Sequence, residues 1–262
     1  MNRALVIAGV VWREMIRRKD VYVLLILLAA MLFSLLSLNL FGLGAVTRYL
    51  MDVGLLMAWL FSIVLVVSLS SRQLPQEEAR GTIYPLLAKP VTRGEVLAGK
   101  WAGAWSAAVA ATALFYAVVM GLAVLRGGRF DGLCLAQAFL LHAVALAVLC
   151  ALALALSTRM TAAASAALTY VAAVAAFVLA PSVPVLLGYE TGPSASGLLI
   201  LYYALPHLDL FDLRQRVIHD WGAASWSTAG QVALYGAIWT LLLLTLAWLA
   251  YRRKRFARGR AL

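Results

Sequence analysis

Residues 133–157 read LCLAQAFLLHAVALAVLCALALALS, which is 25 consecutive residues without Asp, Glu, Lys or Arg. A helix of this length crosses the roughly 30 Å hydrocarbon core of a bilayer. Five further charge-free windows lie on either side of it. The six windows predict transmembrane helices near 21–41, 53–71, 101–125, 133–157, 161–187 and 229–251. The apolar runs are continuous rather than alternating, which favours helices over the strands of an outer-membrane barrel.

The composition also indicates an all-α integral membrane protein. The chain has 262 residues, of which 64% are hydrophobic and 13% are charged. Soluble domains are about 45–50% apolar and about 25% charged. A soluble fold of this length could not bury so much apolar surface. The composition therefore excludes a soluble enzyme, a nucleic-acid-binding domain and a disordered tail.

The basic residues are distributed unevenly between the two sides of the predicted bundle. Of the 22 Lys and Arg residues, 17 precede the first span, follow the sixth, or lie between spans two and three or four and five. The other 5 lie in the remaining connections. Cytoplasmic segments carry the excess of basic residues, so both termini are expected in the cytoplasm of a prokaryotic inner membrane. The net charge of +11 then reflects topology and contact with anionic membrane lipid, and no nucleic-acid partner is expected.

Two segments fall outside the predicted spans. Residues 1–19 are apolar early and basic late, which predicts an interfacial helix on the cytoplasmic leaflet, with a simple extension of the first span as the alternative. Residues 188–228 lie on the extracytoplasmic side and contain an apolar run, Gly197–Leu205, that ends at Pro206. This run is too short to cross a bilayer, so short helices or a re-entrant dip are expected. The segment is large enough to bind an extracytoplasmic partner.

The most informative polar segment is 71–105, SRQLPQEEARGTIYPLLAKPVTRGEVLAGKWAGAW, which includes the predicted cytoplasmic loop 72–100. Thr82 can cap a short helix over 83–88, with Pro85 in its first turn, where a missing N–H does no harm. Thr92 and Glu95 form a T-x-x-E capping box for the helix that becomes the third span. The pattern indicates a rigid cytoplasmic element, and an ordinary ordered loop is the alternative.

The order of residues in this loop resembles the ABC-2 type permeases of ABC transporters. The family pattern is E-x-x-G-T-x-x-x-L-L-x-x-P-x-x-R-x-x-x-x-x-G-K, and the chain matches it without a gap from Glu78 to Lys100. One departure is Tyr84-Pro85, where the family more often has an acidic or polar residue followed by an apolar one. The resemblance implies one permease domain over 1–262, folded as a type V exporter-like bundle of six helices with an N-terminal interfacial helix.

The resemblance further implies that the loop contacts a cytoplasmic ABC ATPase, present in two copies. It also implies that two permease chains, identical or paralogous, surround the transport pathway. Glu77, Glu78 and Arg80 are expected to make polar contacts with the ATPase. Ile83, Leu86 and Leu87 are expected to supply an apolar contact with it. The full set of expected coupling residues is Glu77, Glu78, Arg80, Gly81, Thr82, Ile83, Leu86, Leu87, Pro90 and Arg93.

A second motif in the same loop does not predict nucleotide binding. Gly94–Lys100 fits G-x-x-x-x-G-K, but Trp101 stands where a phosphate-binding loop needs Ser or Thr for magnesium. A membrane span also follows the motif, and no strand precedes it. We therefore expect no catalytic, cofactor or metal site in this chain, with ATP and magnesium bound by the partner.

The predicted spans contain no Asp, Glu, Lys or Arg, and His142 is their one histidine. Ion-coupled carriers usually keep such groups at membrane depth. We therefore expect the energy for transport to come from a partner subunit that lies outside the bilayer. We expect His142 to be hydrogen-bonded within the bundle rather than bound to metal. Gly99 and Gly103 form a G-x-x-x-G pair that would allow close helix approach, although the alanine-rich composition also produces such spacings.

Together these features predict the permease subunit of an ATP-driven exporter that has no ATPase motif of its own. The alternative is a membrane anchor or assembly factor, which would use an ATPase to act on an extracytoplasmic protein without transporting a solute. A membrane enzyme is a third possibility, but the sequence offers no convergent set of catalytic groups.

Overall fold

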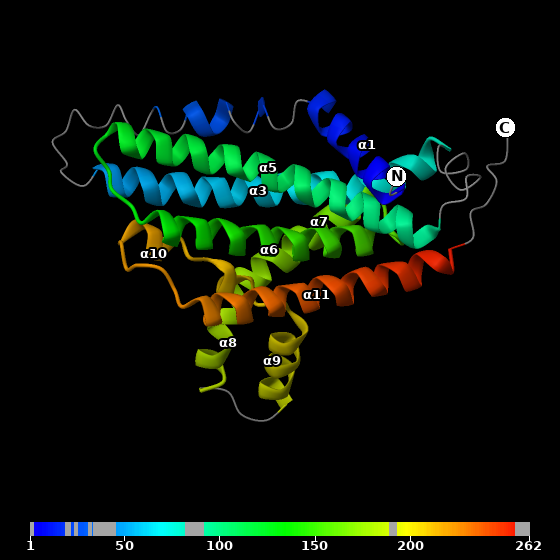
Figure 1. The fold of residues 1–262 in the computed structure, drawn as a ribbon. Coiled ribbons are helices and arrows are strands. Elements are labelled where there is room, and N and C mark those ends of the chain that lie inside the picture. Colours follow the sequence, from blue (N-terminus) through cyan, green and yellow to red (C-terminus); the bar gives the residue numbers. More distant parts are fainter. Residues whose placement is uncertain are drawn as a thin grey trace.

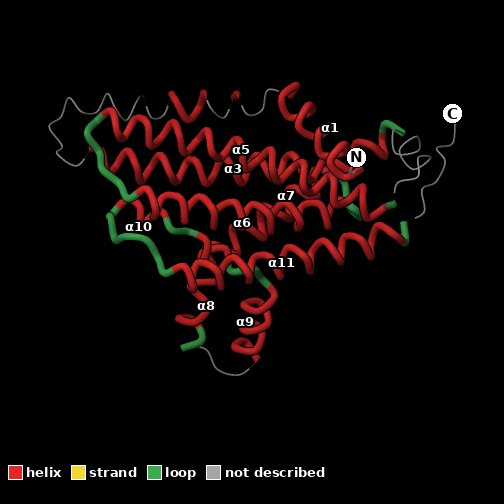
Figure 2. The backbone as a smooth tube through the Cα atoms, viewed as in Figure 1, coloured by secondary structure: helices red, strands yellow, loops and turns green. Residues whose placement is uncertain are grey.

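The computed structural model describes residues 3–18, 22–23, 26–30, 33, 46–81, 92–188 and 193–254. These ranges contain helices joined by loops and no strand (Figure 2). The elements are α1 (Arg3–Arg18), α3 (Val46–Ala79), α5 (Arg93–Leu125), α6 (Gly132–Ser157), α7 (Ala162–Val174), the π-helical turn η2 (Ala175–Leu179), α8 (Ala180–Leu186), α9 (Pro193–Ala204), the 3₁₀ turn η3 (Leu208–Phe211), α10 (Arg214–Ile218) and α11 (Trp226–Arg252).

Four long helices, α3, α5, α6 and α11, run along a common axis, and α7 packs against α3 and α6 (Figure 1). Helix α1 crosses α5 at the end of the bundle where α3 and α11 finish. We call this the α1 end, and we call the opposite end, where α5 finishes and α6 begins, the α10 end. Helices α8 and α9 form a hairpin that projects sideways from the bundle (Figure 1).

Within the described ranges, five helical segments are long and apolar enough to cross a membrane, so the chain is a multi-pass membrane protein. They are Thr47–Ala79, Arg93–Leu125, Gly132–Ser157, Ala162–Leu179 and Trp226–Arg252. They correspond to five of the six spans predicted from sequence. Most of the first predicted span, 21–41, lies outside the described residues, so the count of six stays a prediction. Its described part is helical, and Leu28 is fully buried in a cluster with Leu50 and Phe115.

The helices differ from the predicted spans in length and in straightness. Helix α3 extends well beyond 53–71, and α5 begins at Arg93 rather than near 101, because charge-free windows report the hydrocarbon region and not the helix ends. The predicted helix over 161–187 is helical from Ala162 to Leu186, but it is not regular, since the π-helical turn η2 separates α7 from α8. Pro181 and Pro184 follow this turn. A proline has no N–H and crowds the preceding turn, so a regular helix cannot continue unchanged through them.

Side-chain caps fix where α5, α6 and α11 begin. Thr92 and Glu95 form the predicted capping box: the Thr92 hydroxyl accepts from the Glu95 N–H, and the Glu95 carboxylate accepts from the Thr92 N–H at 2.7 Å. The Asp131 carboxylate starts α6 by accepting from the Leu133 N–H at 2.9 Å. Ser225 caps α11 in the same way, through the Thr228 N–H. Each cap satisfies a backbone donor that a helix end leaves unpaired.

Small side chains allow the helices to approach closely. Ala104, Ala107, Ala108 and Ala111 form one buried face of α5, each at most 2% exposed. At Gly103 an added Cβ would lie 2.8 Å from the Ala8 backbone of α1. The close approach expected from the glycine pair is therefore confirmed at Gly103, and the partner there is α1. A helix does form over most of 1–19, and its position at a membrane surface stays a prediction.

Candidate functional site

The α1 end of the bundle holds the described part of the predicted coupling segment. Glu77 and Glu78 lie in the last turn of α3, which Arg80 and Gly81 follow, and Arg93 opens α5. The other expected coupling residues lie outside the described residues, so their placement stays a prediction. They are Thr82, Ile83, Leu86, Leu87 and Pro90.

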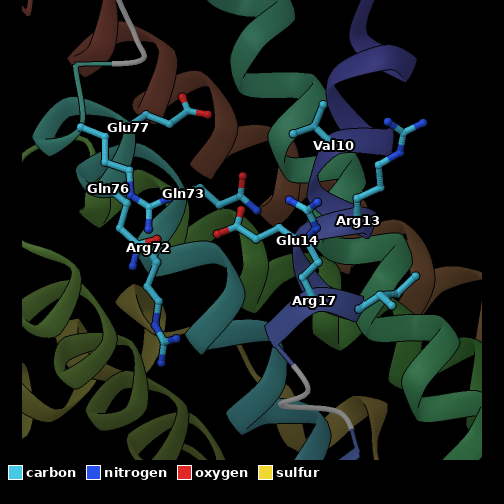
Figure 3. A pocket seen from close by; sticks show the side chains of 10 residues that line it. Val10, Arg13, Glu14, Arg17, Arg72, Gln73, Gln76 and Glu77 are labelled. Atoms are coloured by element: carbon cyan, nitrogen blue, oxygen red, sulfur yellow. The ribbon is translucent and has the colours of Figure 1, made fainter.

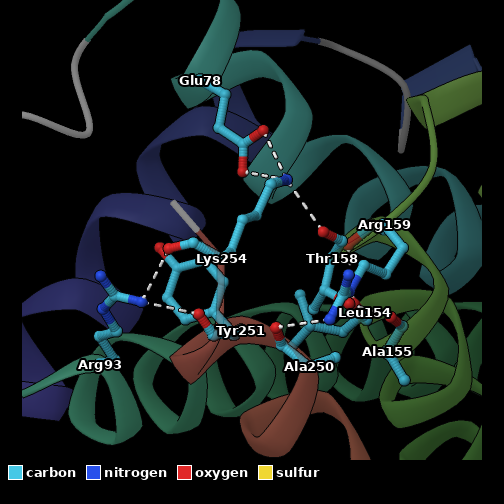
Figure 4. A network of polar contacts seen from close by, with 10 residues as sticks. Glu78, Arg93, Leu154, Ala155, Thr158, Arg159, Ala250, Tyr251 and Lys254 are labelled. Carbon is cyan, nitrogen blue, oxygen red and sulfur yellow. Dashed lines mark hydrogen bonds and ion pairs between the residues drawn. The ribbon is translucent and has the colours of Figure 1, made fainter. Parts of the chain in front are cut away.

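Glu78 joins α3 to two other parts of the chain through Lys254, directly after α11. Lys254 Nζ lies 2.7 Å from each carboxylate oxygen of Glu78 and donates to the Thr158 carbonyl at 2.9 Å (Figure 4). Both charged side chains are 25% exposed. Charge-assisted bonds of this kind are shorter and stronger than neutral ones, and partial burial reduces screening by salt. The ends of α3, α6 and α11 are thereby connected at one ammonium group.

Arg93 binds the C-terminal end of α11. Its Nη1 lies 2.8 Å from the Tyr251 carbonyl and 3.1 Å from that of Lys254 (Figure 4). It also lies 2.9 Å from the Arg252 carbonyl. The last carbonyls of a helix have no partner within it and carry partial negative charge, so a guanidinium there is favourable. The guanidinium carbon also lies 5.8 Å from the centre of the buried Tyr251 ring. The start of α5 is therefore fixed to the end of α11.

A second ion pair connects α3 directly to α5. Lys100 Nζ lies 2.7 Å from Glu77 Oε1, and the Lys100 side chain is 3% exposed. The sequence placed Lys100 just outside the third span, whereas it lies well inside α5 and is buried. A buried ammonium needs its partner, because removal of the carboxylate would leave an uncompensated charge.

A cavity of about 780 Å³ opens between α1 and the last turns of α3 (Figure 3). Figure 3 shows Arg13, Glu14 and Arg17 of α1 facing Arg72, Gln73, Gln76 and Glu77 of α3. Arg80 also contributes to the lining. The lining carries four arginines and two glutamates, so it has a positive surplus beside the Glu77–Lys100 pair.

Gly81 lies in the turn that directly follows α3. Its φ is +67°, a left-handed conformation that side chains with a Cβ rarely adopt, and its N–H donates to the Glu78 carbonyl at 3.2 Å. The turn at Gly81 therefore fixes the direction in which the chain leaves Glu78 and enters the segment 82–91.

A sequence model of the ABC-2 family of transporter proteins matches residues 56–255. This match covers most of the chain, from the middle of α3 to just beyond α11. The chain belongs to the ABC-2 family. A comparison with curated proteins found none that matches it. As an ABC-2 protein with several apolar helices, the chain is a membrane permease subunit of an ABC transporter.

Sequence reasoning did not predict which residues of the ABC-2 chain itself bind Glu77, Glu78 and Arg93. Lys254 was one of several basic residues counted only for topology, and 176 positions separate it from Glu78. No local pattern connects such distant residues. Lys100 was quoted as part of the family motif, but nothing in the motif pairs it with Glu77. The carbonyls of Thr158 and Tyr251 carry no sequence signal at all, because every residue has one.

His142 is held by the core of the permease, as expected. Its Nε2 lies 2.8 Å from Ser62 Oγ, and its Nδ1 lies 3.3 Å from the Tyr116 hydroxyl. Its ring stacks on Trp59 with 4.0 Å between centroids. Among the described residues there is no group of three or more His, Cys, Asp or Glu that could hold a metal ion. His142 thus joins α3, α5 and α6 in the interior of the bundle.

Arg93→Ala is expected to destabilise the permease, because three carbonyls at the end of α11 lose their donor. Hydrogen bonds to charged groups contribute about 1.5–3 kcal/mol, so a clear fall in melting temperature should follow in detergent. Arg93→Lys should recover part of it, since one ammonium still favours the helix end. Arg126→Ala, an exposed arginine at the far end of the same helix, is the control. Equal melting temperatures for Arg93→Ala and the native protein would contradict this role.

Proposed function

We propose that this chain exports a substrate across the inner membrane of a prokaryote, driven by a separate cytoplasmic ABC ATPase. Two permease chains, identical or paralogous, would work with two ATPase subunits. The α1 end would face the cytoplasm with both termini, and the α8–α9 hairpin would lie toward the opposite side. The ABC-2 family match and the uneven distribution of basic residues support this orientation.

The connection of α3, α5 and α11 at the α1 end carries the proposal. The segment 82–91 joins the last turn of α3 to the first turn of α5, and both turns are bound to the end of α11 through Lys254 and Arg93. A force applied to this segment would therefore move three long helices together. Helices of about 30 residues extend roughly 45 Å, so a displacement at the cytoplasmic end reaches the far side of the membrane.

The energy for transport would come from the partner. The predicted spans carry no acidic or basic residue apart from His142, and that histidine is engaged by Ser62 and Tyr116. ATP and magnesium would be bound by the ATPase, and this chain would supply the pathway and the docking surface. The cavity between α1 and α3, with its surplus of arginines, suits an acidic segment of that partner.

Gly81→Pro tests the coupling role in the complex of this chain with its ATPase. Proline cannot adopt the positive φ of Gly81, so the chain would leave α3 in a different direction. We expect stimulation of ATP hydrolysis and uphill transport in proteoliposomes to fall at least about tenfold, which corresponds to about 1.4 kcal/mol in a rate. Gly127→Pro changes a glycine of similar φ, +75°, at the α10 end, and should leave coupling intact. Normal transport by Gly81→Pro would defeat the proposal.

The α8–α9 hairpin supports one alternative function. In this alternative, the chain is an ATPase-coupled anchor or assembly factor that acts on an extracytoplasmic protein. The hairpin projects from the bundle and exposes Ile200 at 71% and Tyr203 at 73%. An extracytoplasmic protein could bind such a surface. This function predicts that the complex hydrolyses ATP but accumulates no solute, and that removal of α9 abolishes action on the partner protein while ATP hydrolysis continues.

A further inference from the structure

A cavity of about 580 Å³ lies at the base of the α8–α9 hairpin, away from the coupling residues. Residues of α8, α9, the η3 turn and α11 line it, and it is open to the surface. Aromatic and proline side chains dominate its lining. The lining residues that the argument uses are Tyr202, Tyr203, His207, Asp209, Tyr235 and Trp239.

The rings form a continuous aromatic wall. Tyr202 lies edge-on to His207 with 4.3 Å between centroids, and edge-on to Tyr203 at 5.4 Å. On the α11 side, Tyr235 lies edge-on to Trp239 at 6.5 Å. Ring faces carry the negative part of the aromatic quadrupole and attract organic cations.

Two polar atoms of residues that line the cavity are buried and have no hydrogen-bond partner among the described residues. They are Asp209 Oδ1 and His207 Nε2. The Tyr235 hydroxyl accepts from the His207 backbone N–H at 3.0 Å and lies 3.1 Å from His207 Nδ1. Because that hydroxyl already accepts one hydrogen bond, it can donate its own proton to Nδ1, which favours the ring proton on Nε2. Such unpaired buried groups are costly unless something else binds them.

We propose that this cavity binds an organic cation, such as a quaternary or primary ammonium group, between the aromatic rings and the Asp209 carboxylate. A neutral sugar could stack on the same rings, but it would leave the carboxylate charge uncompensated. A metal ion would need more ligands than the described lining supplies, since His207 and Asp209 are its only metal-binding side chains. The His207 Nε2–H is available for an oxygen atom of the same ligand.

A second cavity indicates that the ligand is amphiphilic. A groove of about 550 Å³ runs between α3 and α7, lined by apolar residues such as Leu60, Val174 and Phe177. Asp209 lines this groove as well as the aromatic cavity. The neighbouring Asp212 is neutralised by Arg214, with 2.7 Å between Oδ2 and Nη2. Asp209 has no ion pair within the part of the chain that the structure describes, so it supplies a negative charge where the aromatic cavity and the apolar groove meet, which suits a cationic head with an alkyl tail.

This inference goes beyond ATP-driven export, because binding requires only the permease chain. If the proposed function is correct, the cavity would be a substrate site on the extracytoplasmic side. Binding measured without the ATPase and transport measured with it can fail independently, so the two proposals remain distinguishable.

The test is calorimetric titration of the purified full chain in maltoside detergent with three probes. They are choline, its neutral isostere 3,3-dimethylbutan-1-ol, and hexyltrimethylammonium. Choline should bind at least about tenfold more tightly than the isostere, because only the cation gains from the rings and the carboxylate. Hexyltrimethylammonium should bind at least about tenfold more tightly than choline, because its tail buries several methylenes.

Asp209→Asn should weaken binding of both cations at least about tenfold and leave the isostere unchanged. The control Asp220→Asn removes a carboxylate of another cavity at the α10 end and should have no effect. Tyr203→Leu should weaken cation binding about threefold or more, whereas Tyr49→Leu, at a similarly exposed tyrosine on α3, should not. All four variants should keep the native melting temperature, since the substituted side chains contribute little to the core.

Several results would overturn the proposal. Equal affinity for choline and its isostere, or unchanged cation binding by Asp209→Asn, would exclude a cation site. Tighter binding of maltose or of a divalent transition metal than of any organic cation would assign the cavity to another ligand. Equal affinity for choline and hexyltrimethylammonium would remove the alkyl groove from the site.

Discussion

Glu78→Lys should uncouple the permease from its ATPase more strongly than any other single change at the α1 end. In the native chain, Lys254 Nζ lies 2.7 Å from Glu78 Oε1. The substitution places a second ammonium group opposite Lys254, so the end of α11 would separate from α3. Charge-assisted hydrogen bonds contribute about 1.5–3 kcal/mol, which corresponds to roughly a 10- to 100-fold loss in a rate. The measurement is substrate-stimulated ATP hydrolysis by the purified complex, with membrane insertion checked in parallel.

The exchanged pair, Glu78→Lys with Lys254→Glu, separates two explanations of such a loss. If the ion pair within the permease matters, the exchange should restore a large part of the coupling. Recovery should be incomplete, because a carboxylate at position 254 cannot donate to the Thr158 carbonyl. If Glu78 instead acts by contacting the ATPase, the exchange should be as inactive as Glu78→Lys alone. Unchanged coupling in Glu78→Lys itself would show that this cluster does not transmit the motion.

Gly103→Leu should displace α1 from α5. A Cβ at this position would lie 2.8 Å from the Ala8 Cα and 2.9 Å from the Ala8 carbonyl oxygen, and backbone cannot move aside as a flexible side chain can. Displacement would expose Val11 and Met15, which are 3% and 6% exposed in the folded chain. Overpacking costs about 1–3 kcal/mol and sometimes more. We expect a lower melting temperature and faster tryptic cleavage at the arginines of α1.

Gly121→Leu is the matched control for this change. Gly121 lies on the same helix, and no atom outside its own helical turn lies within 4 Å of an added Cβ. Both substitutions replace a helical glycine by a good helix former, so their intrinsic effects on helix stability are equal. A fall in stability confined to Gly103→Leu would therefore report the contact with α1. Similar behaviour of the two variants would contradict the close packing.

The long apolar segments could be predicted because each span carries its own signal. A bilayer requires a run of about 20 apolar residues, and every such run is visible locally. The start of α5 was predictable for the same reason, since the Thr92–Glu95 capping box involves only residues within one turn. The π-helical turn within 161–187 was not predicted, although Pro181 and Pro184 are visible in the sequence, because prolines can be tolerated in membrane helices.

The candidate sites depend far more on tertiary structure. Glu78 could be assigned to the coupling segment from its motif, but its pairing with Lys254 requires α3 and α11 to end side by side. Nothing in the sequence distinguishes Asp209 from the other acidic residues of the segment 188–228. Its position between an aromatic cavity and an apolar groove depends on how α8, α9 and α11 pack around the η3 turn.

The sequence by itself determined that this is a helical membrane protein of the ABC-2 type, which segments are long and apolar enough to cross a bilayer, and which loop carries the family motif. These properties follow from solvation and from contacts within a few residues, so each of them can be recognised in a short stretch of the sequence. Tertiary structure alone decided which charges neutralise one another, where α1 packs, and where one buried oxygen of the Asp209 carboxylate has no hydrogen-bond partner among the described residues. Those outcomes depend on residues of different helices, such as Glu78 and Lys254, which lie 176 positions apart, and only the packing of the helices brings them into contact.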